Sequence, residues 1–265
     1  MLKRLLGLCA LAVAALAGSA QGAVAYGVSG STYLQNFDSL PTAATESAIV
    51  GGWVDDTTLA GWFSNQTTLF RVGAGGVSNG SLYSYGTLAS TERALGSLGG
   101  GTGAAGTGTP YNGLAYGVAF VNTTGQTLTS FSLTFTGEQW RNGGNATAHK
   151  LTFGYQTFSG SLPAGFITAG GYTGDALLDF TGPIALATAA ALDGNAAANR
   201  IAGITDTVAL TWAPGDTLVL RWDDRNDAGS DHGLAIDDLS FTATPAPGSL
   251  ALLGLGALVG SRRRR

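Results

Sequence analysis

The sequence predicts an all-β fold: a single antiparallel two-sheet sandwich of jelly-roll type, flanked by an N-terminal signal helix and a short C-terminal hydrophobic helix. Three observations lead to this prediction. Apolar residues alternate with Ser and Thr, turn residues separate the alternating stretches, and helical periodicity is almost absent. Residues 26–244 are numerous enough to bury the core of one domain, and two packed sheets are the natural closure at that length.

The first 25 residues have the layout of a secretory signal peptide. A short basic start precedes an apolar stretch at residues 5–17, and small residues follow it. Cleavage is expected after Ala20, Gly22 or Ala25. Because Cys9 is the only cysteine and would leave with this segment, we expect a mature chain without disulfides.

Short alternating stretches predict the strands of the β-sandwich domain at residues 26–244. In the stretch at residues 129–137, for example, Phe131, Leu133 and Phe135 share one face, with Ser and Thr on the other. The clearest predicted strands are AYGVAFVN (115–122), TSFSLTFTG (129–137), KLTFGYQTF (150–158), DTVALTW (206–212), DTLVLRW (216–222) and GLAIDDLSFTA (233–243).

The charge of the body argues against one class of partner. Seven of the 13 Lys and Arg residues and all 17 Asp and Glu residues lie in it, which gives a formal charge of −10 against −4 for the whole chain. Such a body would repel phosphate backbones, so we expect no nucleic-acid partner. The same acidity suits solubility outside the cell and the binding of hard cations.

Acidic residues are concentrated at residues 221–241, RWDDRNDAGSDHGLAIDDLSF. Clustered carboxylates on a turn-rich loop supply the hard oxygen ligands that calcium prefers. The alternative is that these side chains cap turns through their own backbone and close a hairpin. The candidate calcium ligands are Asp223, Asp224, Asp227 and Asp231.

Catalysis has weaker support in the sequence. His232 beside Asp231 offers a base, and Glu138 with Asp224 offers an acid and base pair of the kind that glycoside hydrolysis requires. The His-Glu-x-x-His motif of zinc proteases does not occur. We therefore expect a non-catalytic protein, and an extracellular glycan hydrolase that uses carboxylates is the alternative.

Aromatic residues offer a second route to a function. Exposed tryptophans bind polysaccharide in many proteins, but large aromatic residues more often pack in the core. Both interpretations apply here to Trp53, Trp62 and Trp140.

The C-terminal segment, PAPGSLALLGLGALVGSRRRR at residues 245–265, indicates a membrane-directed tail. Its apolar run, residues 250–260, is shorter than the roughly 20 residues that a spanning helix needs. The arginines are expected to stay on the cytoplasmic side, so the body would lie outside. We expect transient rather than permanent anchoring by this tail.

The same residues resemble the PEP-CTERM sorting signal, although Ala246 stands where that signal usually has Glu. The resemblance implies a signal peptidase and an exosortase-like membrane enzyme as partners. It also implies transient anchoring in the inner membrane of a Gram-negative bacterium that makes exopolysaccharide, followed by release to the cell surface or extracellular matrix. The alternative is a simple tail anchor without processing. The residues that carry the resemblance are Pro245, Pro247, Arg262, Arg263, Arg264 and Arg265.

Four stretches of the body carry a second resemblance. They are similar to a recurring unnamed β-domain of secreted bacterial proteins, which implies an accessory sandwich with no established activity. The stretches are STERALGSLG (90–99), TGEQWR (136–141), LDGNAAANR (192–200) and the acidic segment 221–241.

Overall fold

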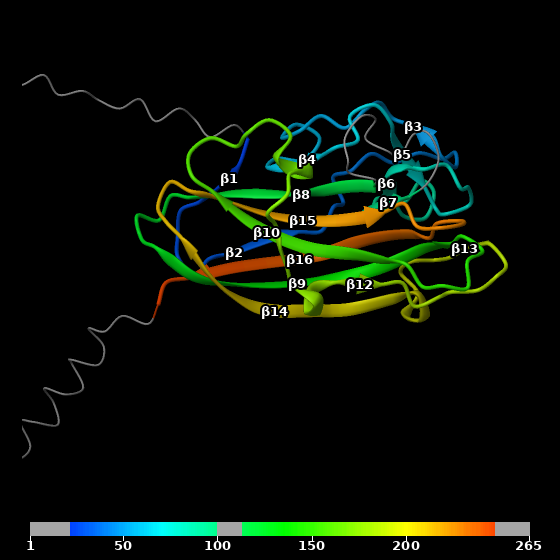
Figure 1. Ribbon diagram of the computed structural model, residues 1–265. Coiled ribbons are helices and arrows are strands. Elements are labelled where there is room, and N and C mark those ends of the chain that lie inside the picture. Colours follow the sequence, from blue (N-terminus) through cyan, green and yellow to red (C-terminus); the bar gives the residue numbers. More distant parts are fainter. Residues whose placement is uncertain (1–21, 100–112, 247–265) are drawn as a thin grey trace, which may run out of the picture.

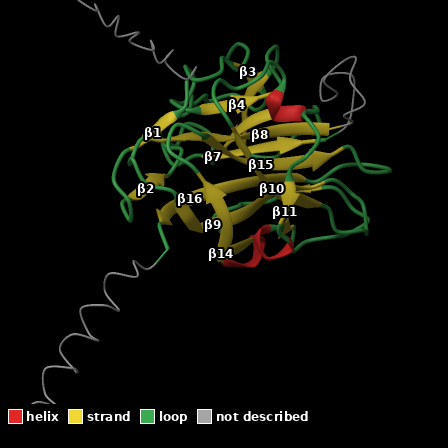
Figure 2. Ribbon diagram, turned by 60° about the vertical axis from the view of Figure 1, so that its left-hand side comes forward, coloured by secondary structure: helices red, strands yellow, loops and turns green. Residues whose placement is uncertain are grey.

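The computed structural model describes residues 22–99 and 113–246, and these residues form two β-sheets packed against each other (Figures 1 and 2). The prediction of an all-β sandwich is confirmed. Within the described part of the chain, the helical residues form three short 3-10 turns: η1 (Phe166–Thr168), η2 (Ala176–Leu178) and η3 (Ala197–Asn199). None of these turns has the length or the apolar character needed to cross a membrane. Both predicted terminal helices lie outside the described residues, and the jelly-roll topology stays a prediction.

Sheet A contains seven strands within the described residues, and its main path runs β1-β8-β15-β10-β11. In addition, β4 pairs with β8 and β12 pairs with β10. The strands are β1 (Val24–Tyr26), β4 (Trp62–Ser64), β8 (Gly113–Asn122), β10 (Lys150–Phe158), β11 (Thr173–Gly174), β12 (Phe180–Thr181) and β15 (Thr217–Arg225).

Sheet B contains nine strands within the described residues, and its main path runs β13-β9-β16-β7-β6-β5-β3. In addition, β14 pairs with β9 and β2 pairs with β16. The strands are β2 (Thr32–Gln35), β3 (Ala48–Ile49), β5 (Phe70–Gly73), β6 (Ser81–Tyr85), β7 (Ala94–Leu98), β9 (Leu128–Asn142), β13 (Ala190–Ala191), β14 (Arg200–Trp212) and β16 (Gly233–Thr244).

Both sheets are mixed, so the prediction of a purely antiparallel sandwich is wrong for two strand pairs. Strand β1 runs parallel to β8, and β5 runs parallel to β6. Alternation of apolar residues shows which side chains share a face, but it carries no information on the direction of the neighbouring strand. The sequence pattern therefore predicted the faces and not the two parallel pairs.

The core lies between the two sheets and is rich in aromatic side chains. Trp222 of β15 stacks on Trp62 of β4, with ring centroids 6.1 Å apart. From sheet B, Phe135 packs edge-on against Trp222, with centroids 5.4 Å apart. The residues predicted to share an inner face are buried here, including Phe131, Leu133 and Phe135 of β9, and Leu218 and Leu220 of β15. The predicted alternation is thus confirmed in both sheets.

The two described ends of the chain leave the sandwich at the same end (Figure 1, left). The Tyr26 hydroxyl accepts a hydrogen bond from the Ala243 backbone N–H at 2.8 Å, which joins β1 to the end of β16. At the opposite end, Gly233 at the start of β16 pairs with Arg141 near the end of β9. The acidic loop at residues 226–232, which connects β15 to β16, therefore lies away from both termini.

Strand β1 includes two residues of the predicted signal peptide. Val24 pairs with Phe120 and Ala25 pairs with Val121 in sheet A. Cleavage after Ala25 would remove this pairing, whereas cleavage after Ala20 or Gly22 would keep it. Of the three predicted cleavage positions, those after Ala20 and Gly22 are thus compatible with an intact β1.

We expect Phe241→Ala to destabilise the fold by about 3–5 kcal/mol, because the ring is fully buried and its removal leaves a cavity. The Phe241 ring stacks on Phe120 at a centroid distance of 4.3 Å and packs edge-on against Tyr26 at 5.6 Å. Urea unfolding followed by circular dichroism measures the change. Leu34→Ala is the control, since that side chain is 72% exposed. Equal stability losses in both variants would contradict the placement of the core.

Candidate functional site

The acidic loop at residues 226–232 crosses from one sheet to the other. Strand β15 before it pairs with β8 and β10 in sheet A, and β16 after it pairs with β9, β7 and β2 in sheet B. The predicted hairpin is therefore wrong, because the two flanking strands do not pair with each other. As a result, the loop faces residues at the ends of β9 and β10.

Two of the four candidate calcium ligands point to opposite faces of sheet A. Asp223 lies on the outer face, where its Oδ2 forms an ion pair of 2.7 Å with Arg221 Nη2. Arg221 in turn lies over the Tyr172 ring, with its guanidinium carbon 3.7 Å from the ring centroid. Asp224 follows directly on β15 and is buried on the inner side with Trp222. Asp223 is thus separated from the other three candidates by the alternation of the strand.

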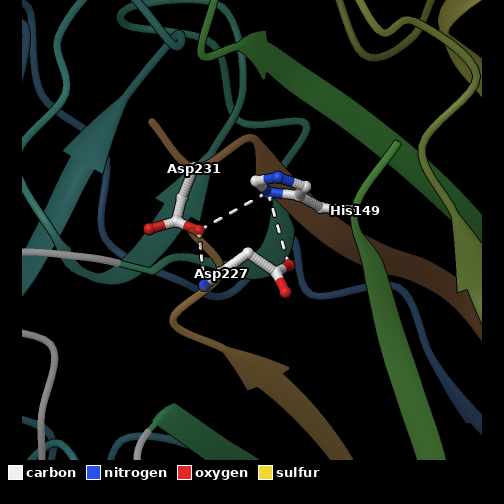
Figure 3. Close-up of side chains that lie close together, drawn as sticks. All are labelled: His149, Asp227 and Asp231. Atoms are coloured by element: carbon white, nitrogen blue, oxygen red, sulfur yellow. Dashed lines mark hydrogen bonds and ion pairs between the residues drawn. The ribbon is translucent and has the colours of Figure 1, made fainter. Parts of the chain in front are cut away.

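Asp227 and Asp231 instead converge on His149, which precedes β10 (Figure 3). His149 Nδ1 lies 3.5 Å from Asp227 Oδ2 and 3.5 Å from Asp231 Oδ1. Asp231 Oδ1 also accepts a hydrogen bond from the Asp227 backbone N–H at 2.9 Å. For Asp231, this bond is the turn-capping role that the sequence offered as the alternative to calcium binding.

Both ring nitrogens of His149 face a hydrogen-bond donor. Asn145 Oδ1 accepts from the Thr147 N–H at 2.9 Å, and Asn145 Nδ2 donates to the Ala228 carbonyl at 2.9 Å, which fixes the amide orientation. The same Nδ2 lies 3.1 Å from His149 Nε2, so Nε2 is the acceptor. His149 Nδ1 accepts a hydrogen bond from the His232 backbone N–H at 3.3 Å. The three residues therefore connect the loop to the segment before β10, and we interpret them as a brace for the loop.

His232 is also held inside the protein and is not placed to act as a base. Its Nδ1 accepts from the Gly143 N–H at 2.8 Å, and its Nε2 lies 3.1 Å from the Thr147 carbonyl oxygen, to which it donates. Burial lowers the pKa of His232, and the neighbouring His149 lowers it further. These are the only two histidines of the chain, and their rings lie 4.4 Å apart.

Asp224 is buried close to this brace. Loss of hydration is the main reason why the pKa of Asp224 is raised to about 8, and the charges of Asp231 and Asp227 contribute to the increase. Its Oδ2 and the Oδ2 of Asp231 are both buried without a hydrogen-bond partner. The end of the sandwich therefore contains carboxyl groups whose burial on folding costs free energy.

A second cluster of carboxylates lies on the outer face of sheet B, and the sequence did not predict it. The cluster consists of Glu92, Glu138 and Asp237. Each contributes one carboxylate oxygen, and these three oxygens lie within 4.8 Å of one another. Glu138 is on β9 and Asp237 on the neighbouring strand β16, and Glu92 precedes β7. Glu138 is thus separated from Asp224, so the proposed acid and base pair does not form.

Neutral donors hold two of these carboxylates in place. Trp140 Nε1 donates to Glu138 Oε2 at 2.9 Å, and Asn195 Nδ2 donates to Glu92 Oε2. Burial raises the pKa of Glu138 to about 7 and that of Asp237 to about 9. Asp237 Oδ1 is buried with no hydrogen-bond partner. Within the described residues, none of the three carboxylates takes part in an ion pair.

The four stretches that resemble the secreted β-domain meet at this second cluster. Glu92 belongs to STERALGSLG, Glu138 and Trp140 to TGEQWR, Asn195 to LDGNAAANR, and Asp237 to the acidic segment. Residues so far apart in the chain give no local spacing signal. The shared resemblance of the four stretches was the one sequence signal that could have brought them together.

The three tryptophans considered for polysaccharide binding are buried, so the interpretation as core residues is confirmed for all of them. Trp53 and Trp62 lie in the core between the sheets. Trp140 lies on the outer face of sheet B but is covered, and it stacks on Tyr85 with centroids 6.1 Å apart. A Cβ added at Gly194 would lie 2.4 Å from the indole of Trp140, so the loop covers the ring only with glycine at this position.

Comparisons with known proteins assign no family. No family model and no curated protein sequence matches the chain. The N-terminal CBM22-1-CBM22-2 tandem domain of Paenibacillus barcinonensis Xyn10C is 11% identical at a TM-score of 0.33, and the match covers 78% of this chain and 48% of that one. The chain thus spans about half the length of this tandem domain.

Two further solved structures give weaker matches. The K3 cleaved adhesin domain of Lys-gingipain from Porphyromonas gingivalis w83 is 15% identical at a TM-score of 0.29, with 57% of this chain and 74% of that one covered. Arabinose-bound MgGH51 α-L-arabinofuranosidase is 11% identical at a TM-score of 0.28, with 83% and 29% covered. Likenesses of this size assign neither a ligand nor an activity to the chain.

We expect the free energy of unfolding to fall as the pH rises from about 4 to about 8. Asp224→Asn should make this fall smaller. The folded state holds the Asp224 proton up to a pKa of about 8, whereas an Asp in an unfolded chain releases it near about pH 3.9. The stability that this proton contributes is therefore complete below about pH 4 and is lost as the pH rises to about 8, with a slope of at most about 1.4 kcal/mol per pH unit.

Urea unfolding of the wild type and of Asp224→Asn at a series of pH values measures this difference. The variant should gain stability relative to the wild type as the pH rises. Asp216→Asn serves as a matched control, because its position lies in the turn between β14 and β15. Parallel pH profiles for the wild type and Asp224→Asn would contradict the burial of an ionisable group at this position.

Proposed function

We propose that this chain is a non-catalytic, exported protein of the cell surface or extracellular matrix, associated with polysaccharide. One observation carries the non-catalytic part of the proposal. The groups that the sequence offered for catalysis are buried and held within the fold: Glu138 is 1% exposed, Asp224 2% and His232 0%. A reacting group must contact its substrate, and these side chains have no surface for that contact.

The alternative, a glycan hydrolase acting through carboxylates, has less support. Such an enzyme needs two carboxyl groups on either side of a bound sugar, about 5 to 10 Å apart. Glu138 contacts Trp140 on the outer face of sheet B, while Asp224 lies on the inner side of sheet A. The best candidate pair for the hydrolase is thus divided between two sheets.

Delivery to the surface would use the C-terminal sorting tail. The proposal rests on the resemblance of residues 245–265 to the PEP-CTERM signal, and those beyond residue 246 lie outside the described residues. Its structural support is that β16 ends at Thr244, directly before Pro245. The last strand of the described structure therefore ends before the proposed sorting segment begins.

A hollow on the outer side of sheet A is the place we propose for contact with a polysaccharide. It has a volume of about 400 Å³ and is lined by Asp55, Asp56, Phe63 and Phe166, among others. Asp55 Oδ1 accepts from the Ser64 N–H at 3.0 Å and Asp56 Oδ1 from the Gly61 N–H at 2.7 Å. Carboxylates beside aromatic edges suit the hydroxyls and apolar faces of sugars, and the acidity of the body favours a neutral polymer.

We expect the protein recovered from the native cell surface to begin at Gln21 or Ala23 and to end close to Pro247. The early start keeps β1 paired with β8, and the tail is removed by sorting. Intact-mass measurement of the surface-extracted protein tests both ends. A mass that includes the four terminal arginines would contradict the sorting proposal, and a start at Tyr26 would contradict the role of β1.

We expect the double variant Asp55→Asn and Asp56→Asn to bind a neutral exopolysaccharide about tenfold more weakly than the wild type, since hydrogen bonds to charged groups contribute roughly 1.5–3 kcal/mol. Asn keeps the Oδ1 acceptors that hold the local turns. Co-sedimentation with the polysaccharide of the native host measures binding, with Asp216→Asn as the control. Unchanged binding would remove the hollow as the contact surface. New reducing ends formed by the wild type would instead support the hydrolase.

A further inference from the structure

The carboxylate cluster of Glu92, Glu138 and Asp237 has the dimensions of a cation site. Its three chosen oxygens all lie within 4.8 Å of one another. Oxygen ligands lie about 2.3–2.6 Å from a bound Ca²⁺, so two ligands of one ion are never more than about 5 Å apart. The three residues come from three separate places in the sequence and are brought together by sheet B. Rigid strands therefore hold at least two of the three ligands in position.

A buried oxygen without a partner gives independent support. Asp237 is 6% exposed, and its Oδ1 has no hydrogen-bond partner. Carboxylate oxygens removed from water normally find a donor or a cation, because an unsatisfied charged group is costly to bury. Asp237 extends from the same sheet face as Glu138, and one of its two carboxylate oxygens is among the three that lie within 4.8 Å of one another, so a bound ion would contact this carboxylate.

The contacts around the cluster orient the carboxylates without neutralising them. The Trp140 indole and the Asn195 amide are uncharged donors, and each binds one carboxylate oxygen. This leaves the second oxygen of Glu138 and of Glu92 for another partner. Donors that hold metal-binding carboxylates from outside are typical of the surroundings of metal sites.

Nearby arginines do not supply the missing positive charge. Arg93 directly follows Glu92 in the sequence. Its guanidinium donates hydrogen bonds to the Ser84 hydroxyl at 2.8 Å and to the Ser84 carbonyl, and not to the Glu92 carboxylate. Arg200 is close enough to influence Glu138 and forms no ion pair with it in the described structure. Within the described residues, no arginine or lysine forms an ion pair with any of the three carboxyl groups.

We propose that Glu92, Glu138 and Asp237 bind Ca²⁺ on the outer face of sheet B, under the segments that carry Glu92 and Asn195. The donor set is oxygen only, which suits a hard cation and not the softer metals that select imidazole or thiolate. Glu92 is half-buried, so the ion can enter from its side. The proposal rests on these side chains alone and is independent of export, sorting and polysaccharide binding.

The test is thermal unfolding of the full chain after treatment with a chelator, in Ca²⁺, in Mg²⁺ and in NaCl at matched ionic strength. We expect Ca²⁺ to raise the melting temperature more than the other two, with an apparent Kd of about 10⁻⁴ to 10⁻³ M. Glu138→Gln and Asp237→Asn should each weaken this response at least tenfold, roughly the loss seen when groups around metal sites are changed. Both variants keep the shape of the side chain and remove one carboxylate ligand.

The two variants should melt at a higher temperature than the wild type when no divalent cation is present, because each replaces an ionisable group that is costly to bury with a neutral amide. An increase in melting temperature without divalent cations would show that the variants have lost the cation site and kept the fold, since a damaged fold would melt at a lower temperature. Asp227→Asn is the control, since it removes a carboxylate from the His149 brace and should retain the response to Ca²⁺.

Terbium(III) provides a second readout, because it replaces Ca²⁺ and emits when a nearby indole is excited. Trp140 donates to Glu138, so bound terbium should emit on tryptophan excitation, and Ca²⁺ should displace it. Glu138→Gln should abolish this emission. Three results would each overturn the proposal. The melting shifts could be equal in Ca²⁺, Mg²⁺ and NaCl, the Ca²⁺ response could survive both substitutions, or the Ca²⁺ response could be lost in Asp227→Asn instead.

Discussion

A β-bulge at Asp238 in β16 determines which side chains face the core and which face outward in the centre of sheet B. Between the pairs Asp237–Thr136 and Ser240–Thr134, two residues of β16 lie opposite a single residue of β9, and Asp238 has φ 50°. The extra residue reverses the alternation, so Ile236 before it and Leu239 after it both reach the core. Without the bulge, either the core residues after it or those before it would point outward.

The same bulge connects the core to the carboxylate cluster. It allows β16 to keep Ile236 in the core while Asp237 stands outside, diagonally across from Glu138 on β9. Two buried carboxylates on adjacent strands repel each other and lose hydration, and both effects oppose folding. Aromatic packing such as the stack of Phe120 on Phe241, two residues after Leu239, must offset this cost. The fold therefore carries a polar cluster whose burial its core has to stabilise.

The sequence predicted the all-β class and the inner faces well, because period-two alternation reflects burial directly, as in Phe131 and Phe135. It even contains the bulge: in GLAIDDLSFTA the apolar positions change parity at the two aspartates. The parallel pairs, the crossing of the acidic loop between sheets and the contact of Asp227 with His149 were not predictable in this way. Each depends on residues distant in the sequence, and alternation carries no information about long-range partners.

The arrangement of the strands gives the molecule two different ends. Tyr26 joins β1 to the end of β16, so both sequence segments with targeting character leave from one end. The acidic loop lies at the start of β16, 12 residues away, which corresponds to about 40 Å of extended strand. If the C-terminal segment anchors the chain as proposed, the loop with Asp227 and Asp231 would therefore lie on the side that faces away from the membrane.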